Sequence, residues 1–401
     1  MDKPGSRSLI TLLTALVALG PVSISLYVPS MPALAVEFQA TSGMVQQSFT
    51  IFVVGFAVAQ LVYGPLSDRF GRRPVLVGGL VLYIAASLAC ALSSGIDQFL
   101  AARLAQGLGA CVGPVVVRAI VRDRFERVDA VRAFAFIGTA IALAPAIGPL
   151  IGGFLEVWFG WRSAFLFLVG YGFLMTGLVL ARLKESVPER DSSATDPVRL
   201  VRNYASLLSN RRYLAYMAPV TFCFGGLFAY NATAPFLFID RLGLSPDQFG
   251  MLAIFTVSTY AGGSLLAGRL GGRLSTRSTA SAGLAAAGLA TALMLLLAGE
   301  LSLARVIGPM MLFVFGFGLL IPACTAAALQ PFPRIAGSAS ALMGFLQMGM
   351  GAGGSLIMSR IYDGTAMSLG LVMALMAALG AAGFLLLAPS AAAEDLTVGG
   401  G

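Results

Sequence analysis

A short polar stretch between two long apolar segments reads Gly64-Pro65-Leu66-Ser67-Asp68-Arg69-Phe70-Gly71-Arg72-Arg73-Pro74. Its glycines permit close backbone approach and a tight turn, and its aspartate can accept hydrogen bonds from the N-terminus of a neighbouring helix. Its arginines can pair with acidic groups on adjacent loops. We interpret it as a charged cluster between two helices; the alternative is a topology anchor alone. The residues that we assign to the cluster are Gly64, Asp68, Arg69, Gly71, Arg72, Arg73 and Asp123.

The sequence around this stretch is strongly apolar. Of its 401 residues, 58% are hydrophobic and 11% are charged, whereas an ordinary soluble domain has about 25% charged residues. So few charges cannot cover the surface of a soluble protein of this length, which argues against a cytosolic enzyme. A net charge of +8 would suggest nucleic acid as the partner of a soluble chain. In a membrane protein basic residues mark cytoplasmic loops, so we expect the lipid bilayer as partner and no nucleic acid.

Twelve segments are long and apolar enough to cross a bilayer, which takes about 20 residues. We therefore expect an all-α integral membrane protein with an N-terminal six-helix bundle at 1–182, a cytoplasmic linker at 183–211 and a C-terminal six-helix bundle at 212–401. We interpret the linker as a solvated connection that could hold one short surface helix, rather than a folded regulatory domain. The spans that we expect are 8–35, 45–65, 74–94, 98–121, 131–156, 163–182, 212–238, 246–268, 279–299, 303–328, 337–360 and 367–388.

The distribution of basic residues predicts the orientation. When the spans are threaded back and forth, most of the 26 lysines and arginines fall on the side that carries both termini. The positive-inside rule then places both termini in the cytoplasm. We expect a multi-pass protein of a bacterial-type inner membrane.

An internal repeat supports two related halves. Residues 268–277 read Gly-Arg-Leu-Gly-Gly-Arg-Leu-Ser-Thr-Arg, and both this segment and residues 64–73 fit G-x-L-x-x-R-x-x-x-R. A weaker echo pairs Gly148, Gly152 and Gly153 with Gly349, Gly353 and Gly354 at a similar offset. Such duplication predicts pseudo-symmetric bundles around a cavity that opens to either face, which is a transporter architecture.

Residue types that catalyse reactions or bind metals are scarce. Histidine is absent, and the four cysteines lie singly in apolar runs. We therefore expect no metal site, no cofactor and no disulfide framework, and an ATP-binding Walker A motif is missing. The spans contain no cluster of acids, histidines or serine motifs that would indicate a membrane-embedded enzyme.

The fourth and fifth spans carry the most specific intramembrane patterns. Span four contains Arg103-Leu104-Ala105-Gln106-Gly107, and an arginine in hydrocarbon faces a cavity or partner unless it extends to the membrane edge. Arg118 would share its face on a straight helix, so we assign Arg103, Gln106 and Arg118 to the transport pathway. Span five is rich in small residues, which allow close helix packing, and in prolines, which bend helices. Its packing motif consists of Pro145, Gly148, Pro149, Gly152 and Gly153.

Polar and aromatic residues midway along the spans are the candidates for binding a small-molecule substrate. Each of them could instead make a hydrogen bond between helices. The many Met and Phe side chains could provide an adaptable apolar cavity. The candidates are Ser25, Tyr27, Gln60, Tyr230, Asn231 and Gln347.

These patterns resemble the major facilitator superfamily: residues 64–74 its loop 2–3 signature, the Arg103 segment its second motif, and span five the motif of its exporters. Segments 23–32, 118–123 and 230–236 look like the Bcr/CflA group of drug-resistance exporters. The resemblance implies an exporter of small organic molecules that works by alternating access in exchange for protons, with an arginine involved in proton transfer. We expect it to act as a monomer. We expect the charged cluster to clamp the two halves in the outward-facing state. The alternatives are a dedicated exporter of an endogenous metabolite or siderophore, and a nutrient importer.

One departure concerns proton coupling. Where the group usually carries an aspartate two residues before the first-span tyrosine, this chain has Ser25 before Tyr27. Every Asp and Glu falls at a predicted span end or in a loop, and Glu37, Glu156 and Asp240 come closest to the outer membrane edge. Glu37 and Glu156 are weak candidates for the missing acid, because a loop position supplies little desolvation.

Overall fold

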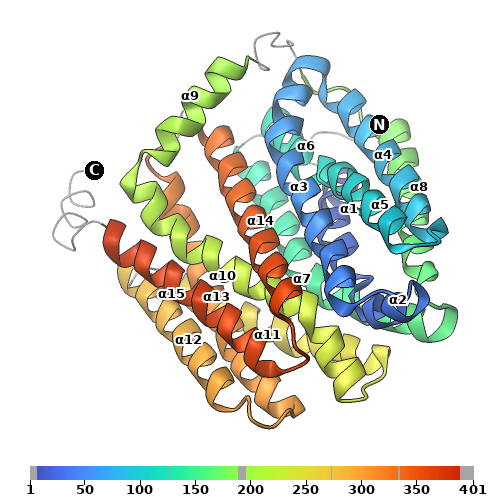
Figure 1. The fold of residues 1–401 in the computed structure, drawn as a ribbon. Coiled ribbons are helices and arrows are strands. Elements are labelled where there is room, and N and C mark those ends of the chain that lie inside the picture. Colours follow the sequence, from blue (N-terminus) through green and yellow to red (C-terminus); the bar gives the residue numbers. More distant parts are fainter. Residues whose placement is uncertain (1–6, 126, 188–195, 272, 333–334, 389–401) are drawn as a thin grey trace. The chain divides into compact units, whose positions relative to one another are not determined.

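A computed structural model describes residues 7–125, 127–187, 196–271, 273–332 and 335–388. Within these ranges the regular structure is helical (Figure 1). Twelve described segments are long and apolar enough to cross a membrane. The predicted all-α fold with 12 spans is therefore confirmed.

The first six spans and the linker have these helices, in which η1 is a 3-10 turn: α1 (Arg7–Ser25), η1 (Val28–Ser30), α2 (Met31–Glu37), α3 (Ser42–Phe70), α4 (Arg72–Leu92), α5 (Ile96–Ala110), α6 (Val112–Arg124), α7 (Arg127–Phe159), α8 (Arg162–Arg182) and α9 (Pro197–Leu208). The last six spans are α10 (Arg211–Pro235) with the π-helical turn η2 (Phe236–Arg241), α11 (Pro246–Leu270), α12 (Thr276–Leu296), α13 (Leu303–Leu329), α14 (Ala336–Ile361) and α15 (Ala366–Leu387). The short surface helix that the linker could hold is α9.

Two predicted spans are interrupted. The first consists of α1, η1 and α2, because prolines at 29 and 32 cannot donate backbone hydrogen bonds at that point. The fourth is divided at Cys111 into α5 and α6, just before Pro114. By contrast, α7 continues as one helix through both of its prolines.

The predicted loop at 64–73 is almost entirely helical. Helix α3 continues to Phe70 and α4 begins at Arg72, so Gly71 alone connects them. Gly71 has a φ of 102°, which a residue with a side chain rarely adopts. Asp68 and Arg69 therefore lie in the last turn of α3 rather than in a loop.

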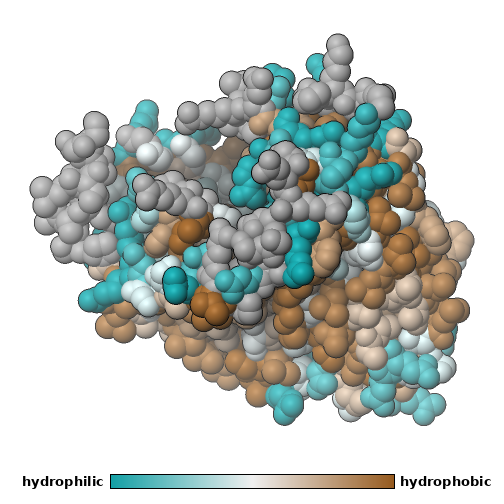
Figure 2. Space-filling model, turned by 90° about the horizontal axis from the view of Figure 1, so that it is seen from above, coloured by the Kyte–Doolittle hydropathy of each residue, from teal (hydrophilic) through white to brown (hydrophobic). Residues whose placement is uncertain are grey.

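Because successive spans run in opposite directions, α1 begins and α8 ends on the same side of the membrane, which we call the termini side. The connection from α3 to α4 lies there too, whereas α7 ends and α11 begins on the opposite side, called the far side. Large apolar side chains such as Leu92, Leu166 and Phe173 are exposed along the spans, and Figure 2 shows hydrophobic residues over a broad part of the surface in that view. A lipid environment accounts for this exposure.

By packing, the chain forms two units. Unit 1 contains residues 1–196 together with the far-side segments 231–257 and 358–364. Unit 2 contains residues 197–230, 258–357 and 365–401. The division into bundles at 1–182 and 212–401 follows the sequence repeat and stays a prediction. The far-side segments belong to unit 1 because they pack on the N-terminal helices.

Candidate functional site

The charged cluster on the termini side is centred on Arg72, whose side chain is almost completely buried. Its Nε donates to Asp123 Oδ2 on α6 at 2.9 Å, and its Nη1 donates to Ser67 Oγ at 2.7 Å. The guanidinium also forms an ion pair with Asp68. Arg72 therefore joins the end of α3, the start of α4 and the end of α6.

Glu185, which the sequence analysis missed, completes this cluster. Its carboxylate accepts from the backbone N–H of Arg72 at 2.9 Å and of Arg73 at 3.2 Å, which are free donors at the N-terminus of α4. The sequence predicts Asp68 as the acceptor at a helix N-terminus, and the structure has Glu185 in that position instead. A Cβ at Gly71 would lie 2.5 Å from Glu185 Oε2, so the close approach requires glycine. In the sequence Glu185 is one of several acids in the predicted linker, and no spacing rule relates it to the start of the third span.

The remaining cluster residues have smaller roles. Arg73 donates through Nη2 to the Leu180 carbonyl at 2.9 Å, and Arg69 lies over the ring of Phe70. For Gly64 the expected close approach is not present, because a Cβ there would meet no atom within 4 Å. All of these contacts lie within unit 1.

Replacing Asp123 tests the cluster. Asp123→Asn leaves Arg72 with a weaker acceptor, and we expect the free energy of unfolding in mixed micelles to fall by about 1–3 kcal/mol. Asp129→Asn is the matched control, because Asp129 pairs with Arg132 at 3.8 Å on the surface, where such pairs contribute at most about 1 kcal/mol. Equal effects of the two substitutions would contradict the assigned importance of Arg72.

Glu185 predicts a specific dependence on pH. Partial burial raises the pKa of its carboxyl, but the backbone N–H groups of Val187, Arg72, Ser186 and Arg73 outweigh this and hold the pKa below the ordinary value. A lowered pKa means that the ionised group stabilises the fold above the ordinary pKa of about 4.3 and loses this contribution as pH falls through the lowered value.

We therefore expect Glu185→Gln to lower the melting temperature at neutral pH, by an amount that shrinks when the pH falls below about 4. The measurement is thermal unfolding of both proteins in detergent over a pH series. A stability difference that grows in acid would show that the sign is wrong.

Arg103 on α5 is completely buried in unit 1. Its guanidinium carbon lies 4.0 Å from the ring centroid of Tyr27 and 4.3 Å from that of Phe52. Nη1 donates to Gln106 Oε1 at 2.5 Å, and Nε donates to the Ser48 carbonyl at 3.5 Å. The alternative of an arginine extending to the membrane edge is therefore wrong. Among the residues that the structure describes, no salt bridge joins Arg103 to a carboxylate.

The neighbours of Arg103 form a buried polar network. Gln106 donates through Nε2 to Ser87 Oγ at 2.8 Å, and the Tyr27 hydroxyl lies 3.2 Å from Ser48 Oγ. Tyr27, a predicted substrate residue, thus supports Arg103. Arg118 lies partly buried on α6, beyond the interruption at Cys111, so the straight-helix spacing that related it to Arg103 does not apply.

The glycines of span five pack against the interruption in the first span. A Cβ at Gly148 would collide with Ser25 Oγ, and one at Gly152 would collide with the Leu26 carbonyl. The Ser25 hydroxyl donates to the Pro21 carbonyl at 2.9 Å and lies 3.3 Å from the Ala144 carbonyl on α7. Ser25 therefore contacts the span-five helix instead of presenting an acid.

The same helix packs against α11 on the far side. A Cβ at Gly153 would collide with the Pro246 carbonyl, and one at Gly250 would collide with the Pro149 carbonyl. At the start of α3, a Cβ at Gly43 would lie 2.5 Å from the Ser359 carbonyl. Backbone thus meets backbone at each of these far-side contacts, which all lie within unit 1.

An alanine in this interface tests the packing. Gly152→Ala places a methyl group against the Leu26 carbonyl, and we expect overpacking to cost about 1–3 kcal/mol of stability. Gly138→Ala on the same helix is the matched control, because its methyl group would meet no atom within 4 Å. Thermal unfolding should show a lower melting temperature for Gly152→Ala alone; two unchanged melting temperatures would contradict the close packing.

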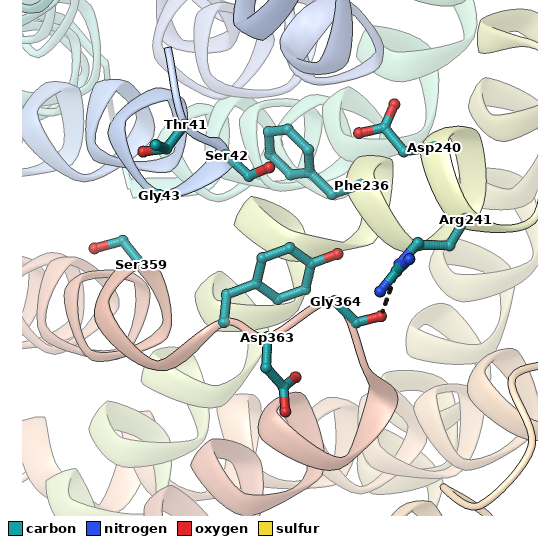
Figure 3. A pocket seen from close by; sticks show the side chains of 10 residues that line it. Thr41, Ser42, Gly43, Phe236, Asp240, Arg241, Ser359, Asp363 and Gly364 are labelled. Atoms are coloured by element: carbon teal, nitrogen blue, oxygen red, sulfur yellow. Dashed lines mark hydrogen bonds between the residues drawn. The ribbon is translucent and has the colours of Figure 1, made fainter.

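Figure 3 shows a far-side cavity of about 460 Å³. It is lined from the start of α3, from η2 and from the end of α14 and the loop after it. The Arg241 guanidinium reaches across it and donates through Nε to the Gly364 carbonyl at 3.2 Å. None of the six predicted substrate residues lines this cavity.

The other predicted substrate residues are distributed over both units. Gln60 is buried on α3 and Asn231 is partly buried on α10, both in unit 1. Tyr230 is buried and Gln347 is partly buried in unit 2. Their substrate contacts stay predictions.

Comparison with known proteins identifies the family. The family model described as Major Facilitator Superfamily matches residues 13–355. The chain belongs to the major facilitator superfamily. An uncharacterized MFS-type transporter of Bacillus subtilis, YdgK, is 34% identical, over 94% of this chain and 94% of its own. Multidrug resistance protein D of Escherichia coli is 32% identical over the same shares.

A bicyclomycin resistance protein homolog of Haemophilus influenzae is 29% identical, over 86% of this chain and 87% of its own. The resemblance to Bcr/CflA-like drug exporters is therefore confirmed. Among solved structures, an inward-facing, unoccupied bacterial homolog of the human lysosomal transporter Spinster matches 96% of this chain and 98% of its own, with a TM-score of 0.75 and 14% identity. This likeness shows the fold. The superfamily fold implies a membrane transporter that works by alternating access.

Proposed function

We propose that this transporter exports small organic molecules, including drugs, out of the bacterial cytoplasm in exchange for protons, and that it acts as a monomer in the inner membrane. Both termini lie in the cytoplasm, as the concentration of basic residues on the termini side supports. The termini side is then cytoplasmic and the far side is external.

The observation that carries export is the packing of span five. Gly148 and Gly152 allow α7 to meet the interrupted first span, and Gly153 with Gly250 allows it to meet α11. These contacts join α7 to the first span and to the start of α11, and we propose that they close the external side. An exporter needs such a closure while its cargo enters from the cytoplasm. The relatives named for drug resistance support the same direction.

The cluster around Arg72 and the network around Arg103 have different roles in the proposed cycle of alternating access. The cluster stands on the cytoplasmic side, and we propose that its ion pairs rearrange as that side opens. Arg103, enclosed by aromatic rings, fixes the first span against α3 and α5 rather than touching cargo. Cargo contacts are assigned to Gln60, Tyr230, Asn231 and Gln347.

Transport in proteoliposomes tests the function. We expect purified protein to move members of a panel of drugs, measured by efflux and counterflow at two imposed pH gradients, and to do so faster when the gradient is inward for protons. Flux independent of the gradient would refute exchange for protons. Accumulation of a labelled metabolite without movement of any drug would favour a dedicated metabolite or siderophore exporter, or an importer.

A further inference from the structure

We propose that Glu156 on α7 and Ser30 in η1 form a proton-binding site on the external side, and that a proton must occupy it for the external side to close. The proposal deepens the proposed function, on which it rests for the orientation and for the exchange of protons. The first span lacks the usual acid, because Ser25 occupies its position. Glu156 would supply an acid for proton binding in its place.

The first argument is the enclosure of two polar atoms. Glu156 Oε2 and Ser30 Oγ are both shielded from solvent, and neither has a hydrogen-bond partner among the described residues. Ser30 is completely buried, and its hydroxyl lies close to the Glu156 carboxylate. Enclosure disfavours the charged form of any carboxylate, whereas a protonated carboxyl can donate to a neighbouring oxygen. The Ser30 hydroxyl can accept from the protonated carboxyl, and it can donate to the ionised carboxylate.

The second argument is the place of Glu156 on α7. It lies one helical turn beyond Gly152 and Gly153, so it projects from nearly the same side of the helix. Gly152 meets the first span at Leu26, and Gly153 meets α11 at Pro246. Separation of the contact between Gly153 and α11 would admit water to the next turn of α7, where an ionised carboxylate is stable. Proton binding and closure are thereby coupled.

Among the residues that the structure describes, no salt bridge joins Glu156 to a basic side chain that could replace the proton. On the neighbouring far-side elements the charged residues are Arg162 on α8, Glu37 on α2 and Asp247 on α11, and Arg162 pairs with Glu37 at 3.1 Å. The other described ionisable side chains on α1, the turn after it, α6, α7 and α8 are Arg7, Tyr27, Arg118, Arg122, Asp123, Arg124, Asp129, Arg132, Tyr171 and Arg182.

One carboxylate and one hydroxyl suit a proton better than a metal ion. Hard metal cations take about six oxygen ligands. Among the described residues no group of three His, Cys, Asp or Glu side chains is placed to hold a metal ion.

The experiment measures closure directly. Spin labels at the exposed positions Val36 and Asp363 report the distance between α2 and the loop after α14 by pulsed electron resonance, in full-length protein in nanodiscs. In the otherwise unaltered protein the closed population should grow as the pH falls from about 8 to 5, a range in which an enclosed carboxyl can titrate. In Glu156→Gln, which mimics the protonated state, it should stay closed throughout.

Glu37→Gln is the matched control, because Glu37 is an exposed far-side carboxylate, and it should titrate like the unaltered protein. If Glu156→Gln fails to fold, Glu156→Asp should titrate with a shifted midpoint. A pH response in Glu156→Gln equal to that of the control, or an unshifted midpoint in Glu156→Asp, overturns the proposal. A midpoint that moves when sodium replaces potassium overturns the assignment to a proton.

Transport separates this proposal from the proposed function. External pH should change the efflux rate of the unaltered protein but not that of Glu156→Gln. If no compound moves in either protein, the proposed function fails, while the label distances still decide the proton site.

Discussion

The absence of water from the hydrocarbon region constrains this protein more than any single contact. Polar groups inside it need partners from the chain itself. Arg103 meets most of this requirement through aromatic faces, Gln106 and a backbone carbonyl, while its Nη2 has no hydrogen-bond partner among the described residues. This arrangement makes the buried arginine a fixed part of the N-terminal packing. The helix of the first span ends at Ser25, close to Arg103 in the packing, and the guanidinium still stays buried away from lipid.

Glycine decides where helices meet by backbone rather than by side chains. The contacts of Gly152 with the backbone of the first span, and of Gly153 with that of α11, bring one helix against two partners. Close contacts of this kind need small residues, because a side chain at the same positions would keep the helices apart. The charged cluster on the termini side differs, because the buried Arg72 holds three helix ends by directional charged bonds. The helices are thus held together by charged hydrogen bonds on the termini side and by close backbone packing on the far side.

The surroundings of Ser25 explain why the first span can lack an acid at this position. Ser25 is bonded toward carbonyl oxygens of α1 and α7, and Gly148 leaves just enough room for it. A carboxylate at position 25 would face those acceptors, which favour a donor. Coupling, if it uses an acid, therefore has to use one elsewhere, and Glu156 is enclosed on the helix that Ser25 contacts.

Apolar length and local motifs are properties of neighbouring residues, and they were enough to predict the number of spans, their rough limits and the family. The packing of the helices was needed to establish that Asp123 bonds to Arg72, that Glu185 binds the start of α4, that Tyr27 and Phe52 enclose Arg103, and that Glu156 lies close to Ser30. These partners are far apart along the chain, and no spacing rule relates them. They come together only when helices pack, and the angle of packing depends on side-chain volume along entire spans.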